Sequence, residues 1–156
     1  GRPPVTLGEL LTTLVKNVEG LYPEHAPIEQ ISVPGTGDSV IPPHEVVSLA
    51  IMINELLTNA VKHGTPGSAC GETIRIGIQA DDDCIRLNID NPGTLPHNLD
   101  FDRRQELGNG LQLMAALLDP PHTRLSLGQL TPASVRATLY LSAPLIRPQH
   151  DLRHVP

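Results

Sequence analysis

The most constraining feature of the chain is an uninterrupted segment from Glu45 to Val61 that contains neither proline nor glycine. Its apolar residues recur at three- and four-residue spacing, so they gather on one broad face of a helix. Four polar residues fall together on the opposite side, spaced i, i+4, i+7 and i+8: Glu55, Asn59, Lys62 and His63. The spacing predicts a long helix that carries a carboxylate, an amide, an ammonium and an imidazole in one stripe.

This polar stripe has two interpretations. It can simply face solvent, as on many amphipathic helices. It also suits a nucleotide, because an amide oxygen can bind magnesium, a cation can bind phosphates and a carboxylate can hold water or metal-bound water. The helix alone leaves both interpretations open, so the other segments of the chain have to decide between them.

Composition narrows the classes of function. The 156 residues suffice for one domain, and the core must be aliphatic because the chain has no Trp, one Phe and two Tyr. A net charge of −6 without a basic run argues against nucleic acid as a partner. Cys70 and Cys84 form no metal-binding pattern, which favours reduced thiols in a cytosolic protein. No apolar run is long enough to span a bilayer, and we expect a cytoplasmic domain whose parent protein could be membrane-anchored.

Periodicity predicts the remaining elements. Thr6 and Glu9 match a capping box that opens a helix to about Leu21, and a further helix is expected at 108–118. Alternating apolar residues predict strands at 28–33, 72–80, 84–91, 123–127 and 134–141. We therefore expect an α+β fold, a two-layer α/β sandwich whose mixed, mostly antiparallel sheet is covered on one face by about three helices. The expected organisation is a linker at 1–5, one domain at 6–144 and a flexible tail at 145–156.

Further segments carry candidate chemistry. The first hairpin ends in Asp90-Asn91-Pro92-Gly93, where polar side chains precede a glycine that lets the backbone approach a ligand. The next helix is entered through Gly108-Asn109-Gly110-Leu111, whose N–H groups can hold a phosphate. Ser134 opens the last strand and offers a hydroxyl group. Each of these segments, standing alone, is also compatible with a plain turn.

In this order, the segments resemble the motifs of the GHKL ATPases, which include sensor histidine kinases, gyrase, Hsp-type chaperones and mismatch-repair ATPases. Glu55-x-x-x-Asn59-Ala60-x-Lys62-His63 is similar to their N box, Ile89 to Gly93 to their G1 box, and Gly108 to Leu111 to their G2 box. The resemblance covers about 6–141. The N-box wording is closest to catalytic domains of bacterial sensor histidine kinases, in the subfamily whose dimerisation helices are of the second type. It implies a Bergerat fold with a mobile ATP lid at about 94–107.

The resemblance implies a role for each matching residue. In the N box, Asn59 would coordinate the magnesium ion that bridges the phosphates, Lys62 would contact phosphate, and His63 would lie near the ribose or the phosphates. Glu55 occupies the place of the water-activating base of gyrase-like members, and in the kinases it would position metal-bound water. The adenine and phosphate ends of the site would be completed by Asp90 or Asn91, Gly93, Gly108, Gly110, Leu111 and Ser134.

Two departures from the family pattern bear on the adenine end. The usual G1 motif is Asp-x-Gly-x-Gly, whereas here Gly93 matches the first glycine and Leu95 replaces the second. The spacing then places Asn91 rather than Asp90 at the adenine-reading position. A step of one residue turns a strand side chain to the other face, so these two cannot both point inward, and either could read adenine. The last box has Pro132-Ala133 in place of its usual glycine pair.

The implied function is the ATP-binding catalytic domain of a two-component sensor histidine kinase, a transferase that uses ATP and Mg²⁺. The γ-phosphoryl group would pass to a His on a separate dimerisation domain, and from there to a response regulator. The fragment itself should be monomeric and should not label itself, because its first helix contains no His. The alternatives are a degenerate module that acts in phosphotransfer or docking without binding ATP, a GHKL hydrolase in which Glu55 activates water, and an anti-sigma-type serine/threonine kinase.

Overall fold

The computed structural model describes residues 4–24, 27–32, 36–63, 73–81, 84–93, 109–119 and 122–142. Within these ranges, the side chains of residues 32, 63 and 109–112 are not described. The predicted lid at 94–107, Gly108 and the tail at 145–156 lie outside the described residues.

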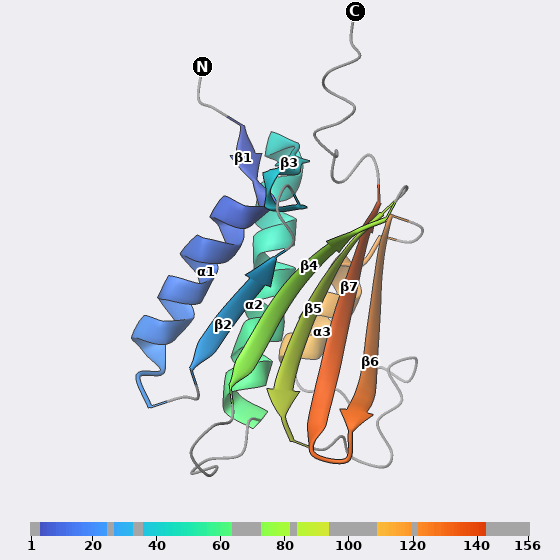
Figure 1. The fold of residues 1–156 in the computed structure, drawn as a ribbon. Coiled ribbons are helices and arrows are strands. Elements are labelled where there is room, and N and C mark those ends of the chain that lie inside the picture. Colours follow the sequence, from blue (N-terminus) through green and yellow to red (C-terminus); the bar gives the residue numbers. More distant parts are fainter. Residues whose placement is uncertain are drawn as a thin grey trace, which may run out of the picture.

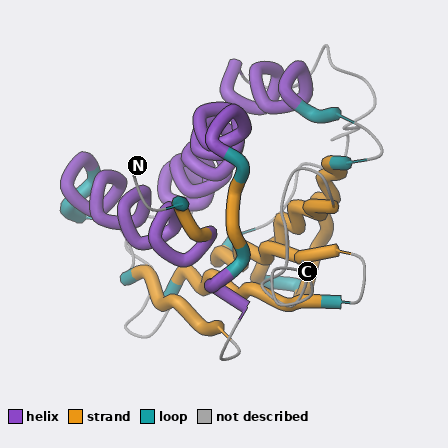
Figure 2. Tube along the Cα trace, turned by 90° about the horizontal axis from the view of Figure 1, so that it is seen from above, coloured by secondary structure: helices purple, strands orange, loops and turns teal. Residues whose placement is uncertain are grey.

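Helices and strands form two separate layers (Figures 1 and 2). The main sheet has the order β2-β4-β5-β7-β6, formed by β2 (Ile28–Ser32), β4 (Ile74–Ala80), β5 (Cys84–Pro92), β7 (Ser134–Ser142) and β6 (Thr123–Thr131). β2 and β4 are parallel and the other neighbours are antiparallel. The parallel pair is joined by a crossover that contains a helix, as parallel neighbours require. The prediction of a mixed, mostly antiparallel sheet covered on one face is confirmed.

The helices are α1 (Leu7–Leu21), α2 (Val46–His63) and α3 (Asn109–Leu117). The capping box at the start of α1 is present: the Thr6 hydroxyl accepts from the Glu9 N–H at 3.2 Å, and the Glu9 carboxylate accepts from the Thr6 N–H at 3.2 Å. α2 is preceded by the short 3₁₀ helix η2 (Pro43–Glu45), where proline suits the first turn. None of the helices in the described part of the chain has the length and apolarity needed to cross a membrane.

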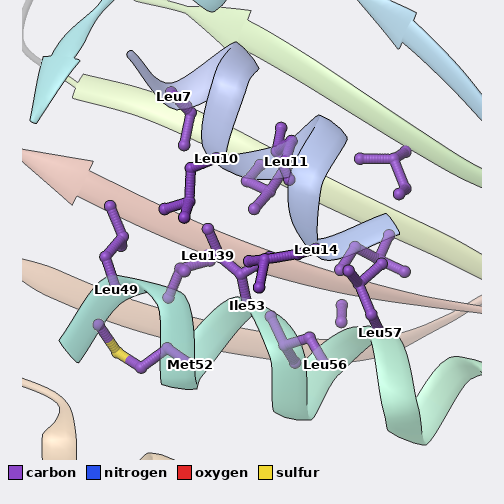
Figure 3. Packing of buried hydrophobic residues seen from close by; sticks show 14 of the residues in the cluster. Leu7, Leu10, Leu11, Leu14, Leu49, Met52, Ile53, Leu56, Leu57 and Leu139 are labelled. Carbon is purple, nitrogen blue, oxygen red and sulfur yellow. The ribbon is translucent and has the colours of Figure 1, made fainter. Parts of the chain in front are cut away.

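The core between the two layers is aliphatic, as the scarcity of aromatic residues predicts. Figure 3 shows Leu14 of α1 beside Ile53 of α2, with Leu139 of β7 near both; Leu11 and Leu57 belong to the same core. Burying each such side chain contributes about 1.5–3 kcal/mol. On β5, Leu87 and Ile89 belong to the same core. The face of the sheet that carries them is therefore the face that the helices cover.

Three short elements were not predicted, and one predicted strand is longer than expected. β1 (Val5–Thr6) and β3 (Val40–Ile41) form a separate antiparallel pair, and η1 (Thr36–Asp38) is a single 3₁₀ turn. Elements of two or three residues are too short to show periodicity. β6 continues to Thr131, beyond the predicted end at Leu127, because pairing with β7 extends the strand past its apolar alternation.

Candidate functional site

Three segments that carry candidate residues meet at one end of the molecule. The C-terminal ends of α2 and β5 and the turn between β6 and β7 all lie at the bottom of Figure 1. α2 also packs against β5 and α3. The fold therefore gathers the predicted N-box and G1-box segments at the same edge of the two layers.

Asn59, in the last part of α2, has a buried side-chain nitrogen. Its Nδ2 atom has no hydrogen-bond partner among the described residues. The other buried nitrogen without a hydrogen bond in that part of the chain is Arg86 Nε, which lies 3.0 Å from the carboxylate oxygen Oδ2 of Asp81. A buried donor without a partner costs about 1–3 kcal/mol, so Asn59 calls for an explanation that Arg86 does not. The interpretation of the stripe as a wholly solvated face does not fit this residue.

The neighbours of Asn59 in the stripe have different environments. Glu55, one turn earlier, is half-buried, and Lys62 is exposed near the end of the helix. His63 is the last residue of α2, and its side chain is not described. The ion pairs within the described residues include neither Glu55 nor Lys62. The carboxylate of Glu55 and the ammonium of Lys62 thus have no salt bridge to the described part of the protein, and they lie on the same helix as the Asn59 amide.

At the end of β5, Asp90 and Asn91 lie on opposite faces of the sheet. Asn91 continues the alternation of Leu87 and Ile89, so it lies on the face that the helices cover. Asp90 lies on the outer face and accepts two hydrogen bonds from Arg136 on β7, Nε to Oδ1 at 2.7 Å and Nη2 to Oδ2 at 2.8 Å. The hydrogen bond and the negative charge of Asp90 raise the pKa of Arg136, against an opposing effect of burial. Asp90 is thereby occupied by a structural ion pair.

The Asn91 amide is oriented by the backbone next to it. Its Nδ2 atom donates to the carbonyl oxygen of Pro92 at 3.0 Å. An amide has both a donor and an acceptor end, so this bond leaves the side-chain carbonyl to accept from a ligand. Gly93 follows with φ 145°, a conformation that favours glycine over other residues. The backbone conformation therefore explains why a glycine occupies this position of the predicted G1 box.

The remaining predicted residues are described to different extents. Ser134 pairs with Pro92 and its hydroxyl lies 2.6 Å from that of Thr131, so by alternation it belongs to the face opposite Asn91. Gly110 lies in the first turn of α3, where helical N–H groups lack partners within the helix. The side chain of Leu111 is not described. Gly108 precedes the described helix.

Sequence reasoning missed two residues at this end of the sheet. Arg136 pairs with a residue 46 positions away, and no local pattern signals such a partner. Gln129 donates to the carbonyl oxygen of Gly93 at 3.1 Å. It could have been found from the alternation of Leu125 and Leu127, because that alternation places a polar residue at the next inward position of β6.

A family model described as "Histidine kinase-like ATPase domain" matches residues 36–127, more than half of the chain. No curated protein matches this chain by sequence. Among solved structures, the blue-light activated histidine kinase of Erythrobacter litoralis EL346 aligns with a TM-score of 0.72 and 15% identity, over 90% of this chain and 42% of that one. The catalytic domain of histidine kinase ThkA aligns with a TM-score of 0.64 and 14% identity, over 85% of this chain and 92% of that domain.

A third similar structure is the histidine kinase AdeS of Acinetobacter baumannii, with a TM-score of 0.59 and 14% identity, over 86% of this chain and 65% of that one. At these identities the likeness concerns the fold. The chain spans less than half the length of the light-activated kinase.

Proposed function

The chain belongs to the family of histidine kinase-like ATPase domains, as its resemblance to the GHKL motifs predicted. We propose that it is the ATP-binding catalytic domain of a two-component sensor histidine kinase. In this proposal it binds Mg-ATP and donates the γ-phosphoryl group to a His on a separate dimerisation domain. That domain would pass the group to a response regulator. We infer a cytoplasmic location from the use of ATP, and a monomeric state for the isolated chain.

The observation that carries the proposal is the side-chain amide of Asn59, whose buried nitrogen has no hydrogen-bond partner among the described residues, on the helix that resembles the family's N box. Mg²⁺ is commonly held by one or two protein oxygens together with substrate phosphates and water. The side-chain oxygen of Asn59 would hold the ion, and its buried nitrogen, which donates hydrogen bonds and binds no metal, would donate to an oxygen of the nucleotide or of water. When bound, the ion would neutralise charge on the phosphates.

The other residues have roles that follow from their positions. Lys62 and His63 would contact the phosphates or the ribose, and Glu55 would orient metal-bound water. The Asn91 carbonyl would accept from the adenine amine, beside the backbone of Gly93. The N–H groups at the start of α3, around Gly108 and Gly110, would bind phosphate oxygens, with Leu111 closing the pocket. Ser134 lies on the face opposite Asn91, so it would support the adenine end only indirectly, through the turn that its bond to the Thr131 hydroxyl holds.

Isothermal titration of the chain with a non-hydrolysable ATP analogue, with and without Mg²⁺, tests the proposal. We expect micromolar binding that requires Mg²⁺. Asn59→Ala should weaken it by about 100-fold, because interactions with charged groups contribute about 1.5–3 kcal/mol. Asn54→Ala is the matched control, since it removes the same side chain from the same helix outside the stripe. Absence of binding by the unaltered chain at millimolar analogue would refute the proposal.

A second candidate function is a degenerate module that acts in phosphotransfer or docking without binding ATP. Two sequence changes favour it: Leu95 replaces the second G1 glycine, and Pro132-Ala133 replaces the glycine pair of the last box. The Pro132-Ala133 turn nevertheless holds the G1 segment, because the carbonyl oxygen of Ala133 accepts from the Gly93 N–H at 2.9 Å. The titration separates the two candidates directly.

Group transfer separates a kinase from a hydrolase. Incubation with labelled ATP and a histidine kinase dimerisation domain should place acid-labile phosphate on that domain and none on this chain. Acid-stable phosphate on a protein substrate would instead indicate a serine kinase. Steady release of inorganic phosphate by the chain alone, abolished in Glu55→Ala, would indicate that Glu55 activates water for hydrolysis.

A further inference from the structure

Gln129 joins the end of β5 to the turn between β6 and β7. Its side-chain Nε2 lies 3.1 Å from the carbonyl oxygen of Gly93, 2.7 Å from that of Thr131 and 2.9 Å from that of Ser134. The amide has two N–H groups for these three acceptors, so at least one hydrogen is shared. One side chain therefore links three backbone positions from two segments that are far apart in the sequence.

The backbone at Gly93 is held from both sides. Its N–H donates to the carbonyl oxygen of Ala133 at 2.9 Å, and its own carbonyl oxygen accepts from Gln129. The carbonyl oxygen of Pro92, in the peptide group that contains the Gly93 N–H, accepts from the Asn91 side chain. A continuous series of hydrogen bonds thus leads from Gln129 through the Pro92–Gly93 segment to the orientation of the Asn91 amide.

A bulge in β6 places Gln129 beside this segment. Gln129 pairs with Val135, which pairs in turn with Asn91 on β5, so the three residues form one row on the helix-covered face. The next pair is Thr131 with Ser134, so Leu130 is an extra residue in β6. Such bulges redirect side chains and recur next to functional sites. Here the bulge lies where Gln129 reaches across to Gly93.

We propose that Gln129 is a positioning residue for the base end of the nucleotide site, and this inference rests on the function proposed above. It holds the Pro92–Gly93 segment so that the Asn91 amide keeps its nitrogen on the backbone and presents its carbonyl oxygen to the base. A carbonyl oxygen accepts from the N6 amine of adenine, whereas guanine offers the acceptor O6 at the equivalent position. Release of the segment would let the amide turn over and donate to O6. Gln129 therefore determines the preference for adenine through Asn91.

The test compares the dissociation constants of non-hydrolysable ATP and GTP analogues for the unaltered chain and its variants. Gln129→Glu keeps the shape of the side chain and removes its N–H donors, and Gln129→Met removes them without adding charge. Gln129 is exposed, so neither change disturbs the core. We expect the preference for ATP over GTP to fall about five- to tenfold in both, by the loss of an oriented hydrogen bond. Gln79→Glu, on the exposed side of β4, is the matched control and should leave the preference unchanged.

A purely structural role would lower affinity for both nucleotides equally and would not depend on Asn91. In the Asn91→Ala background, Gln129→Met should leave the preference unchanged, because the group that it positions is absent. An unchanged preference in both single variants would overturn the inference, as would loss of folding in both or equal binding of ATP and GTP by the unaltered chain. Failure of the unaltered chain to bind either nucleotide would instead overturn the proposed function, and this inference with it.

Discussion

The two faces of the sheet differ in how far their polar side chains are hydrogen-bonded to other residues. On the outer face the polar side chains of β5 and β7 pair with one another, as the bidentate bonds between Arg136 and Asp90 show. On the helix-covered side, Asn59 has a buried nitrogen without a partner among the described residues, and the Asn91 carbonyl oxygen accepts no hydrogen bond from that part of the chain. The difference shows that a group available to a ligand is better identified by a donor or acceptor without a partner in the protein than by its residue type.

Neighbours on one strand show this most directly. Asp90 has the chemistry that the family motif uses for adenine, yet its carboxylate is engaged by a guanidinium on the outer face. Asn91 has the less usual side chain but lies on the face with the core residues Leu87 and Ile89. Register, and not the order of residue types, therefore decides between these candidates in our proposal.

Asn91→Ala provides the largest expected contrast between the faces. Loss of the acceptor for the adenine amine should weaken binding of the ATP analogue about 10- to 30-fold, by the free energy of one well-oriented hydrogen bond. The stability of the fold should fall by no more than about 1 kcal/mol, because within the described residues the Asn91 side chain makes one hydrogen bond, to the carbonyl oxygen of Pro92. Titration calorimetry and urea unfolding measure the two effects separately.

Asp90→Asn is the control for that contrast, because it alters the neighbouring residue on the other face. It should leave the affinity within about threefold of that of the unaltered chain and should lower stability instead. The reverse pattern, with affinity lost in Asp90→Asn and kept in Asn91→Ala, would show that Asp90 reads adenine.

Much of the fold followed from periodicity in the sequence. The polar stripe on α2, the capping box at Thr6 and the alternating strands each depend on contacts within a few residues, which a sequence pattern contains. The sequence left the choice between Asp90 and Asn91 open, although the alternation of Leu87 and Ile89 places Asn91 on the core face. The engagement of Asp90 by Arg136 depends on the pairing of β5 with β7, 46 positions away, which no local pattern contains. The roles of Arg136 and Gln129 depend on the same long-range register.

The outer face can be tested through two arginines that flank Asp90 in the same cross-strand row. Arg136→Met should lower the free energy of unfolding by about 1–2 kcal/mol, because it leaves the part-buried Asp90 carboxylate without its donors. The loss stays moderate since the Arg136 side chain is 42% exposed and water screens the pair. Urea unfolding at constant m-value measures the change.

Arg75→Met is the matched control for Arg136→Met. Arg75 pairs with Asp90 across β4 and β5, but its guanidinium lies 3.7 Å from Glu29, and both of these side chains are more than half exposed. Its replacement should change stability by less than about 0.5 kcal/mol. Equal losses in the two variants would mean that general charge on this face, and not the bidentate pair, stabilises the sheet.

The smallest expected effect concerns the next row of the outer face. The Thr138 hydroxyl donates to the side-chain oxygen of Asn88 at 2.8 Å, and both residues are 8% exposed. Thr138→Val keeps the shape and removes the donor, so we expect a loss of about 1 kcal/mol in unfolding free energy and unchanged nucleotide affinity. Ser126→Ala, an exposed hydroxyl paired with Thr138 on β6, is the control and should have almost no effect.

A double-mutant cycle tests whether the loss of stability in Thr138→Val comes from its hydrogen bond with Asn88. Removing one partner leaves the buried Asn88 oxygen unsatisfied, whereas removing both leaves nothing unsatisfied. Asn88→Leu combined with Thr138→Val should therefore be less destabilised than the sum of the single variants. Additive losses would mean that the two groups contribute to stability independently. The outer face would then gain no stability from pairing its polar side chains, and the energetic contrast with the helix-covered face would be lost.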